Sequence, residues 1–177
     1  VDSANHVLVT GRFRGTVDFG GWALTSAGDS DIFVAKYDSA GSHLWSKRFG
    51  GVGNDEVQSV SAYPDGSGFA IVGMIAGGDR VADFDAAITV IGEGGSDCVV
   101  SKITSEGEFV MADAFGTALN GFDSAGSVTV RGDGSAVVVG KIADDGTIAD
   151  TALDKGGFVV AIKPPVVTTP APTAAPT

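Results

Sequence analysis

The sequence predicts an all-β fold made of a repeated unit of four short antiparallel strands. Three observations lead to this fold class. The 177 residues include 27 glycines and many short Val, Ile and Phe runs, a composition that favours strands and frequent turns over helices. A sequence pattern recurs about every 60 to 67 residues along the chain. No segment has the apolar spacing of an amphipathic helix.

Two short motifs carry the repeat. The first is an apolar run that ends in glycine, and its copies HVLVTG, FAIVG and AVVVG end at Gly11, Gly73 and Gly140, in steps of 62 and 67 residues. The second is an apolar run that ends in lysine, and its copies FVAK, VVSK and VAIK end at Lys36, Lys102 and Lys163, in steps of 66 and 61 residues. Because both motifs recur with nearly the same period, we expect one structural unit to occur more than twice.

Each repeat is expected to contain four strands. In the first copy these are HVLVTGRF, DIFVAKYD, HLWSKRF and EVQSVSAY, and in the second FAIVGMI, CVVSKI, FVMADAF and GSVTVR. A third copy begins with AVVVGKI and FVVAIK and then stops, so we place the repeats at about 5–64, 65–132 and 133–163. Asp65-Gly66 and Asp133-Gly134 are dipeptides typical of hairpin turns, because glycine tolerates a positive φ.

Four antiparallel strands per repeat are typical of a β-propeller blade, whereas the repeat of a β-solenoid is much shorter. The stretch VTG…DF…GDSDIFVAKYDSAGSHLWSKRFGGVGNDEVQSVS resembles the bacterial-type β-propeller repeat called SBBP. The resemblance covers residues 5–163, with Met111 in the second copy at the place of Trp45 and Thr117 at that of Gly51. It implies an extracellular or surface-associated architecture, and it brings no catalytic residues.

The expected ten strands make about two and a half blades, whereas propellers close with about four to eight. Strands at the two ends would therefore keep unpaired backbone groups. The chain could be a fragment of a longer propeller, its sheets could collapse into a sandwich, or copies could pair their strand edges head to tail. We expect the last arrangement, an extracellular structural module that assembles into a filament or larger surface structure.

The composition changes at residues 164–177, PPVVTTPAPTAAPT, which hold five of the six prolines. Proline-rich runs form extended spacers, and mixtures of threonine and proline are typical of O-glycosylated stalks. The candidate glycan acceptors are Thr168, Thr169, Thr173 and Thr177. The alternative is an unmodified linker to a neighbouring domain, and both interpretations favour an extracellular, modular protein.

The charge and the chemistry of the side chains argue against several classes of function. A formal net charge of −11 disfavours nucleic acid and anionic lipid as partners, and no apolar run is long enough for membrane insertion. His6 and His43 are the chain's two histidines, and the HExxH and GxSxG motifs are absent. We therefore expect no catalytic residues and no enzyme.

Three kinds of residue remain as candidates for binding. Calcium is the one cofactor that the acidic turns would suit, with Asp29 and Asp31 in AGDSD and Asp83 and Asp85 in GGDRVADFD as ligands. The alternative is that these carboxylates only accept hydrogen bonds from turn amides. Trp22, in the loop-like GGWALT, is a candidate for stacking on glycans in a carbohydrate-binding or adhesive module, whereas Trp45 and Cys98 are expected to be core residues.

Overall fold

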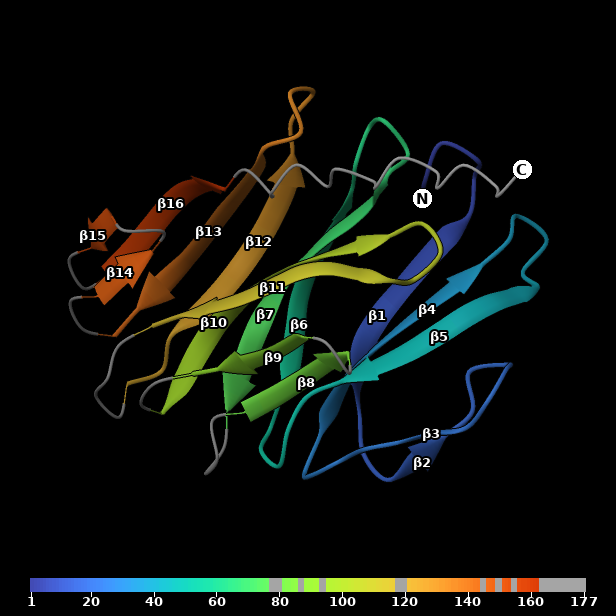
Figure 1. Ribbon diagram of the computed structural model, residues 1–177, viewed down its shortest axis with the longest axis horizontal. Helices are drawn as coiled ribbons and strands as arrows, with labels where there is room; N and C mark the ends of the chain where they lie inside the picture. The colour runs from blue at the N-terminus through green and yellow to red at the C-terminus, as the bar shows by residue number, and fades with distance from the viewer. Residues whose placement is uncertain are drawn as a thin grey trace, which may run out of the picture.

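The computed structural model confirms the all-β prediction (Figure 1). Throughout the part of the chain that it describes, the residues form strands, turns and loops and no helix. The described residues are 1–76, 81–85, 88–92, 95–116, 121–143, 146–148, 151–153 and 156–162.

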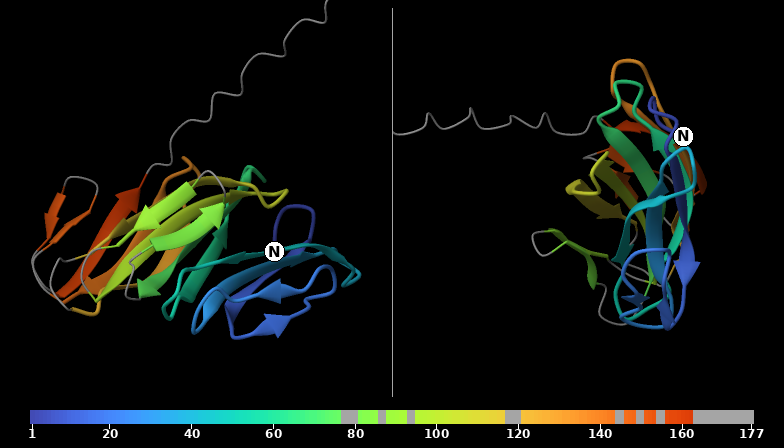
Figure 2. Two further views of the ribbon diagram at one scale, coloured as in Figure 1. Left: turned by 60° about the horizontal axis from the view of Figure 1, so that its bottom comes forward. Right: turned by 90° about the vertical axis from the view of Figure 1, so that its right-hand side faces the viewer.

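Three antiparallel sheets follow one another in chain order, and the second lies between the other two (Figures 1 and 2). The first has the order β1 (Val7–Phe13), β4 (Asp31–Tyr37), β5 (His43–Phe49). The second has the order β11 (Phe109–Phe115), β10 (Ser96–Thr104), β7 (Gly68–Ala76), β6 (Glu56–Ala62). The third has the order β12 (Ser124–Val130), β13 (Ala136–Ile142), β16 (Gly156–Ile162). Among the described strands, none of these sheets closes into a barrel.

In each sheet, a small hairpin lies in sequence between two neighbouring main strands, at the same point along the chain. The hairpins follow β1, β7 and β13, and they are β2–β3 (Thr16–Val17, Leu24–Thr25), β8–β9 (Val81–Asp85, Ile88–Ile91) and β14–β15 (Gly146–Ile148, Thr151–Leu153). The same succession of a main strand, a small hairpin and another main strand therefore occurs three times along the chain. Sequence analysis did not predict these hairpins, because strands of two to five residues give no periodic signal.

Both predicted hairpin turns are confirmed. Gly66 and Gly134 have φ values of 75° and 79°, and the amides of Tyr63 and Arg131 donate 2.9 Å hydrogen bonds across the two turns. These turns join β6 to β7 and β12 to β13. The sheets are therefore divided at a different point from the sequence copies, because the last strand expected in each copy opens the next sheet. The sheets hold three, four and three main strands.

Two hydrophobic cores separate the three sheets. Side chains alternate along β7, so Phe69 and Ile71 enter the core shared with the first sheet, whereas Ala70 and Val72 enter the core shared with the third. The second sheet is thus covered on both faces. The second and third sheets also meet at β6 and β12, where the amides of Val128 and Val130 donate 3.2 Å hydrogen bonds to the hydroxyls of Ser59 and Ser61.

The glycine that ends the first repeated motif allows a close backbone approach. Gly73 lies opposite a bulge in β6, and Gly140 lies opposite a bulge in β12. A Cβ atom on Gly73 would overlap the carbonyl oxygen of Glu56, and one on Gly140 would overlap that of Ser124. Gly11 has no such strand beside it in the described structure, and a Cβ there would meet the ring of Phe33 at 2.8 Å.

This difference predicts unequal costs for the same substitution. We expect Gly73→Ala to lower the free energy of unfolding by about 1–3 kcal/mol, because a backbone carbonyl has to move. Gly11→Ala should cost clearly less, because the end of the Phe33 side chain can shift. Urea unfolding of both variants measures the difference, and equal losses would show that the bulge does not require glycine.

Candidate functional site

Buried charged side chains gather where the sheets meet, and these junctions are the candidate site. In the described part of the chain, five charged residues are buried: Asp31, Lys36, Asp55, Asp97 and Asp123. Charged groups are rarely buried without partners, so each of them requires a physical account.

Asp31 and Asp55 form a carboxylate pair at the junction of the first and second sheets. Asp31 begins β4 and Asp55 directly precedes β6, and both carboxylates occupy the space that a Cβ atom on Gly50 would need. Asp31 Oδ2 accepts a 3.0 Å hydrogen bond from the amide of Ala27 and is ion-paired with the guanidinium of Arg48.

The carboxylate of Asp55 binds two backbone amides. Its Oδ2 accepts a 2.6 Å hydrogen bond from Gly51, and its Oδ1 accepts a 3.1 Å bond from Ala76 at the end of β7. The amide of Asp55 donates a 2.8 Å bond to the carbonyl of Ser30, beside Asp31. Asp55 therefore joins the start of β4 to the far end of β7.

Asp97 and Asp123 form the equivalent pair at the junction of the second and third sheets. Both carboxylates lie against Gly116, which follows β11 as Gly50 follows β5. Asp123 Oδ1 accepts a 2.6 Å hydrogen bond from the amide of Ala143, after β13, as Asp55 does from Ala76. The register of the sheets places Ala114 where the first pair has Arg48, so the strand position that supplies a guanidinium to the first pair holds an alanine at the second.

The electrostatics of the first pair favour a proton on Asp55. Burial is the main cause that raises its pKa, to about 6, and the negative charge of Asp31 adds to it. The amides of Gly51 and Ala76 and the charge of Arg48 act in the opposite direction without cancelling the increase. A carboxyl group with a pKa in this range changes its charge between pH 5 and 7.

This raised pKa predicts a pH-dependent stability. The contribution of Asp55 is fully present below its unfolded-state pKa of 3.8 and is lost as the pH rises through the folded-state value of about 6. We expect the difference in unfolding free energy between Asp55→Asn and the unmodified protein to change by about 1–3 kcal/mol across this window. Urea unfolding from pH 3.5 to 7.5 measures it. The control is Asp113→Asn, because Asp113 is exposed. A difference in unfolding free energy between Asp55→Asn and the unmodified protein that does not change with pH would contradict the raised pKa of Asp55.

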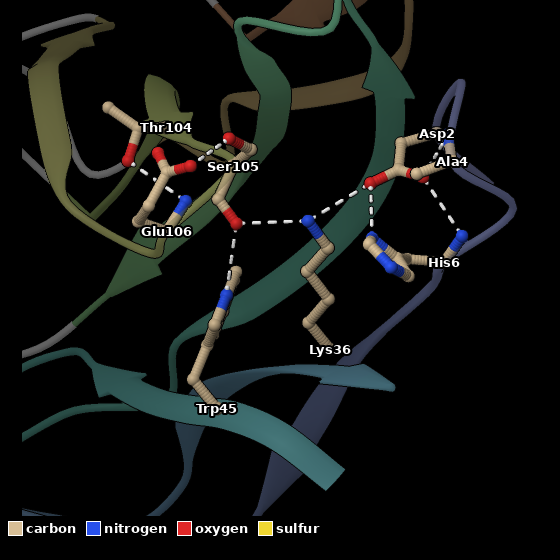
Figure 3. A network of polar contacts seen from close by, with 8 residues as sticks. All are labelled: Asp2, Ala4, His6, Lys36, Trp45, Thr104, Ser105 and Glu106. Carbon is tan, nitrogen blue, oxygen red and sulfur yellow. Dashed lines mark hydrogen bonds and ion pairs between the residues drawn. The ribbon is translucent and has the colours of Figure 1, made fainter. Parts of the chain in front are cut away.

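Lys36, the lysine of the second repeated motif, lies in a polar network that joins three segments (Figure 3). Its side chain is only 5% exposed. Its Nζ is 3.0 Å from Asp2 Oδ2 and donates a 3.0 Å hydrogen bond to the carbonyl of Ser105, in the turn between β10 and β11. The indole Nε1 of Trp45 donates to the same carbonyl at 3.1 Å.

Asp2 is held by several donors at once. The amides of Ala4 and His6 each donate a 2.9 Å hydrogen bond to its Oδ1, and His6 Nδ1 lies 3.1 Å from Oδ2. Burial by itself would raise the pKa of Asp2, but the Lys36 ammonium and the two amides outweigh it and hold the pKa well below its usual range. The N-terminal turn, the first sheet and the second sheet are thus connected through one ammonium group.

We expect removal of this ammonium group to be costly. Lys36→Met keeps the length of the side chain but leaves Asp2 without its ion-pair partner, and should lower the unfolding free energy by about 1.5–3 kcal/mol. Lys47, on the neighbouring strand β5, is the matched control, because its side chain is 37% exposed and its Nζ lies 3.5 Å from Glu108 Oε1. Lys47→Met should cost less than about 1 kcal/mol. Similar losses in urea unfolding would refute the role of Lys36.

The two predicted calcium ligands of the first repeat have different partners in the structure. Asp31 is occupied by Arg48 and Ala27, whereas exposed Asp29 lies 3.5 Å from Asn54 Nδ2. The backbones of Asp83 and Asp85 lie on β8, and their side chains are outside the described residues. Over the described ranges, no three His, Cys, Asp or Glu side chains are grouped as metal ligands usually are. Calcium binding stays a prediction.

Trp22 is 89% exposed on the loop of the β2–β3 hairpin. The hairpin is fixed beneath it, because the ring of Phe19 stacks on Phe33 with centroids 4.1 Å apart and Tyr37 donates a 2.7 Å hydrogen bond to the Phe19 carbonyl. The carboxylate of Asp18 accepts hydrogen bonds from the amides of Gly20 and Gly21. An anchored loop thus presents an aromatic ring to solvent.

The other predicted residues are placed as follows. Cys98 is fully buried in the core between the second and third sheets, as expected, and burial raises the pKa of its thiol to about 12. Trp45 packs against the core between the first and second sheets. Thr168, Thr169, Thr173 and Thr177 lie outside the described residues. In the described part, no helix has the length and apolar character needed to cross a membrane.

Sequence analysis missed the buried carboxylates other than Asp31. A signal was present, since Ser-Asp precedes both FVAK and VVSK, and an aspartate follows each aromatic-Gly segment, at Asp55 and Asp123. The spacing from Phe49 to Asp55 differs from that between Phe115 and Asp123, and this difference conceals the equivalence.

Comparison with known proteins gives one partial similarity and no family. No family model matches the chain. Over 119 residues the chain is 29% identical to the regulatory protein FlaEY of Caulobacter vibrioides. The matched region makes up 65% of this chain and 11% of that protein. The chain therefore spans about a tenth of the length of this relative.

Proposed function

We propose that this chain is an extracellular structural module of the β-propeller type that associates head to tail with further copies of itself. One observation carries the proposal. Among the described strands, β7 and β13 have β6 and β12 as neighbours, but β1 has no equivalent neighbour. At the other end, β4 and β10 are paired with β5 and β11, whereas β16 has no such partner in the part of the chain that the structure describes.

As far as the described strands go, the first and third sheets therefore lack different strands. Unpaired amide and carbonyl groups along a strand edge accept an added strand, and proteins normally cover or pair such edges. Because β1 and β16 are unlike surfaces, a contact between them is heterologous, and a heterologous contact that does not close into a ring produces a filament. Strand-edge pairing between copies would satisfy both edges.

Two other features fit an extracellular repeat module. The segment of residues 164–177 has the composition of a stiff, O-glycosylated stalk, with Thr168, Thr169, Thr173 and Thr177 as acceptors. The similarity to about a tenth of a much longer protein is also what a repeated module inside a larger chain would give. A piece of a longer propeller is the competing interpretation.

A second candidate function is carbohydrate binding or adhesion, and the exposed Trp22 favours it. An aromatic ring on an anchored loop can stack on the apolar face of a sugar. Glycan-array binding that is lost in Trp22→Ala, while the protein stays monomeric, would support this function in place of assembly.

Self-association tests the proposed function directly. We expect sedimentation velocity of the full chain to show species larger than the 17.7 kDa monomer, with a proportion that increases with concentration, and electron microscopy to show fibres. Mass action requires this dependence for any reversible assembly. A single monomeric species across the accessible concentration range would contradict the proposal.

A further inference from the structure

Within the described residues, the outward face of the third sheet carries exposed valines, next to the exposed Lys141 on β13. Val138 and Ile142 of β13 point into the core, so the alternating residues Val137 and Val139 point outward. On the neighbouring strand β16, Val159 pairs with Val139 and is 73% exposed.

The second sheet shows what covers the equivalent face. Val72 and Val100 are paired across β7 and β10 as Val139 and Val159 are across β13 and β16. In the second sheet this valine pair is 0% and 4% exposed, because the third sheet packs on it. The surface that buries such a pair is therefore the inward face of the next sheet in the series.

The first sheet presents the matching surface at the other end of the molecule. Leu8 of β1 packs toward the core, and the alternating Val7 and Val9 are exposed on the outward face. Their equivalents in β7 are Phe69 and Ile71, which lie buried in the core between the first and second sheets. The first sheet thus carries the type of face that covers a preceding sheet.

The small hairpin does not block this face. In the second sheet, Ile88 and Val90 of β9 contribute to the core shared with the first sheet, and the two sheets still pack together. The β2–β3 hairpin follows β1 as β8–β9 follows β7, and it rests on the outward face through Phe19 and Phe33. It leaves Val7 and Val9 exposed.

We propose that the outward face of the third sheet of one copy, around Val139 and Val159, stacks on the outward face of the first sheet of a second copy, around Val7 and Val9. The stacking rests on the proposed self-association and names the surfaces that carry it. It repeats the packing that already joins the second and third sheets, and it uses side-chain faces rather than strand edges.

Charged substitutions on each face test the stacking. We expect Val139→Lys with Val159→Lys, and separately Val7→Lys with Val9→Lys, to abolish species larger than the monomer in sedimentation velocity, because a lysine ammonium cannot be buried unpaired. Val52→Lys with Phe122→Lys is the matched control, since both residues are exposed in loops and the charge change is the same. The control should associate like the unmodified protein. Circular dichroism and thermal unfolding check that every variant is folded.

Mixing the two face variants gives the most specific readout. Each variant retains one intact face, so the mixture should form a dimer of twice the 17.7 kDa chain mass and nothing larger, although each variant alone is monomeric. A mixture that stays monomeric would overturn the stacking, and so would a single face variant that dimerises alone. If both face variants assemble like the unmodified protein, the stacking is wrong while self-association through strand edges stands. If the unmodified protein is monomeric, both the proposed function and the stacking are wrong.

Discussion

Burial of both faces of a sheet is the constraint on which this structure depends. Each main strand alternates between two sets of side chains, and in the second sheet both sets are apolar, with Phe69 and Ile71 on one face and Ala70 and Val72 on the other. A sheet of this kind is stable only between two neighbours, because leaving either face in water forfeits its hydrophobic stabilisation. The three-sheet stack follows from this requirement, and within the second and third sheets Gly73 and Gly140 allow the close backbone approach at the bulges of β6 and β12.

Polar groups fix the relative positions of the stacked sheets. Apolar packing is not directional, whereas the carboxylates of Asp55 and Asp123 bind the amides of Ala76 and Ala143, at the far ends of β7 and β13. Each aspartate therefore orients the chain that enters a new sheet. The cost is the proximity of two buried carboxylates, which Arg48 reduces at the first junction. This pattern explains why charged residues lie in the interior of a domain that shows no grouped metal ligands in its described part.

The fold class and the hairpin turns could be predicted from the sequence, because turn chemistry and strand composition are local properties. Asp65-Gly66 identified the turn between β6 and β7, and the same dipeptide showed that these strands pair, yet the repeat boundary was placed between them. A periodic sequence has no intrinsic starting point, so only the pairing defines which strands share a sheet. The candidate site was harder to predict, since the role of Asp55 depends on contact with Ala76, a partner distant in sequence that no local pattern identifies.

Uncovered strand edges and uncovered faces differ in what they contribute to association. A hydrogen bond formed at an edge replaces bonds to water and contributes a net of about 0.5–1.5 kcal/mol, whereas each buried valine contributes about 1.5–3 kcal/mol. Two copies that each carry a net charge of −11 also repel one another, and salt reduces that repulsion without weakening apolar contact. A stack built mainly on faces should therefore be strengthened by ionic strength. The three sheets of one chain already demonstrate this geometry, since the contact that buries Val72 and Val100 is made of apolar faces.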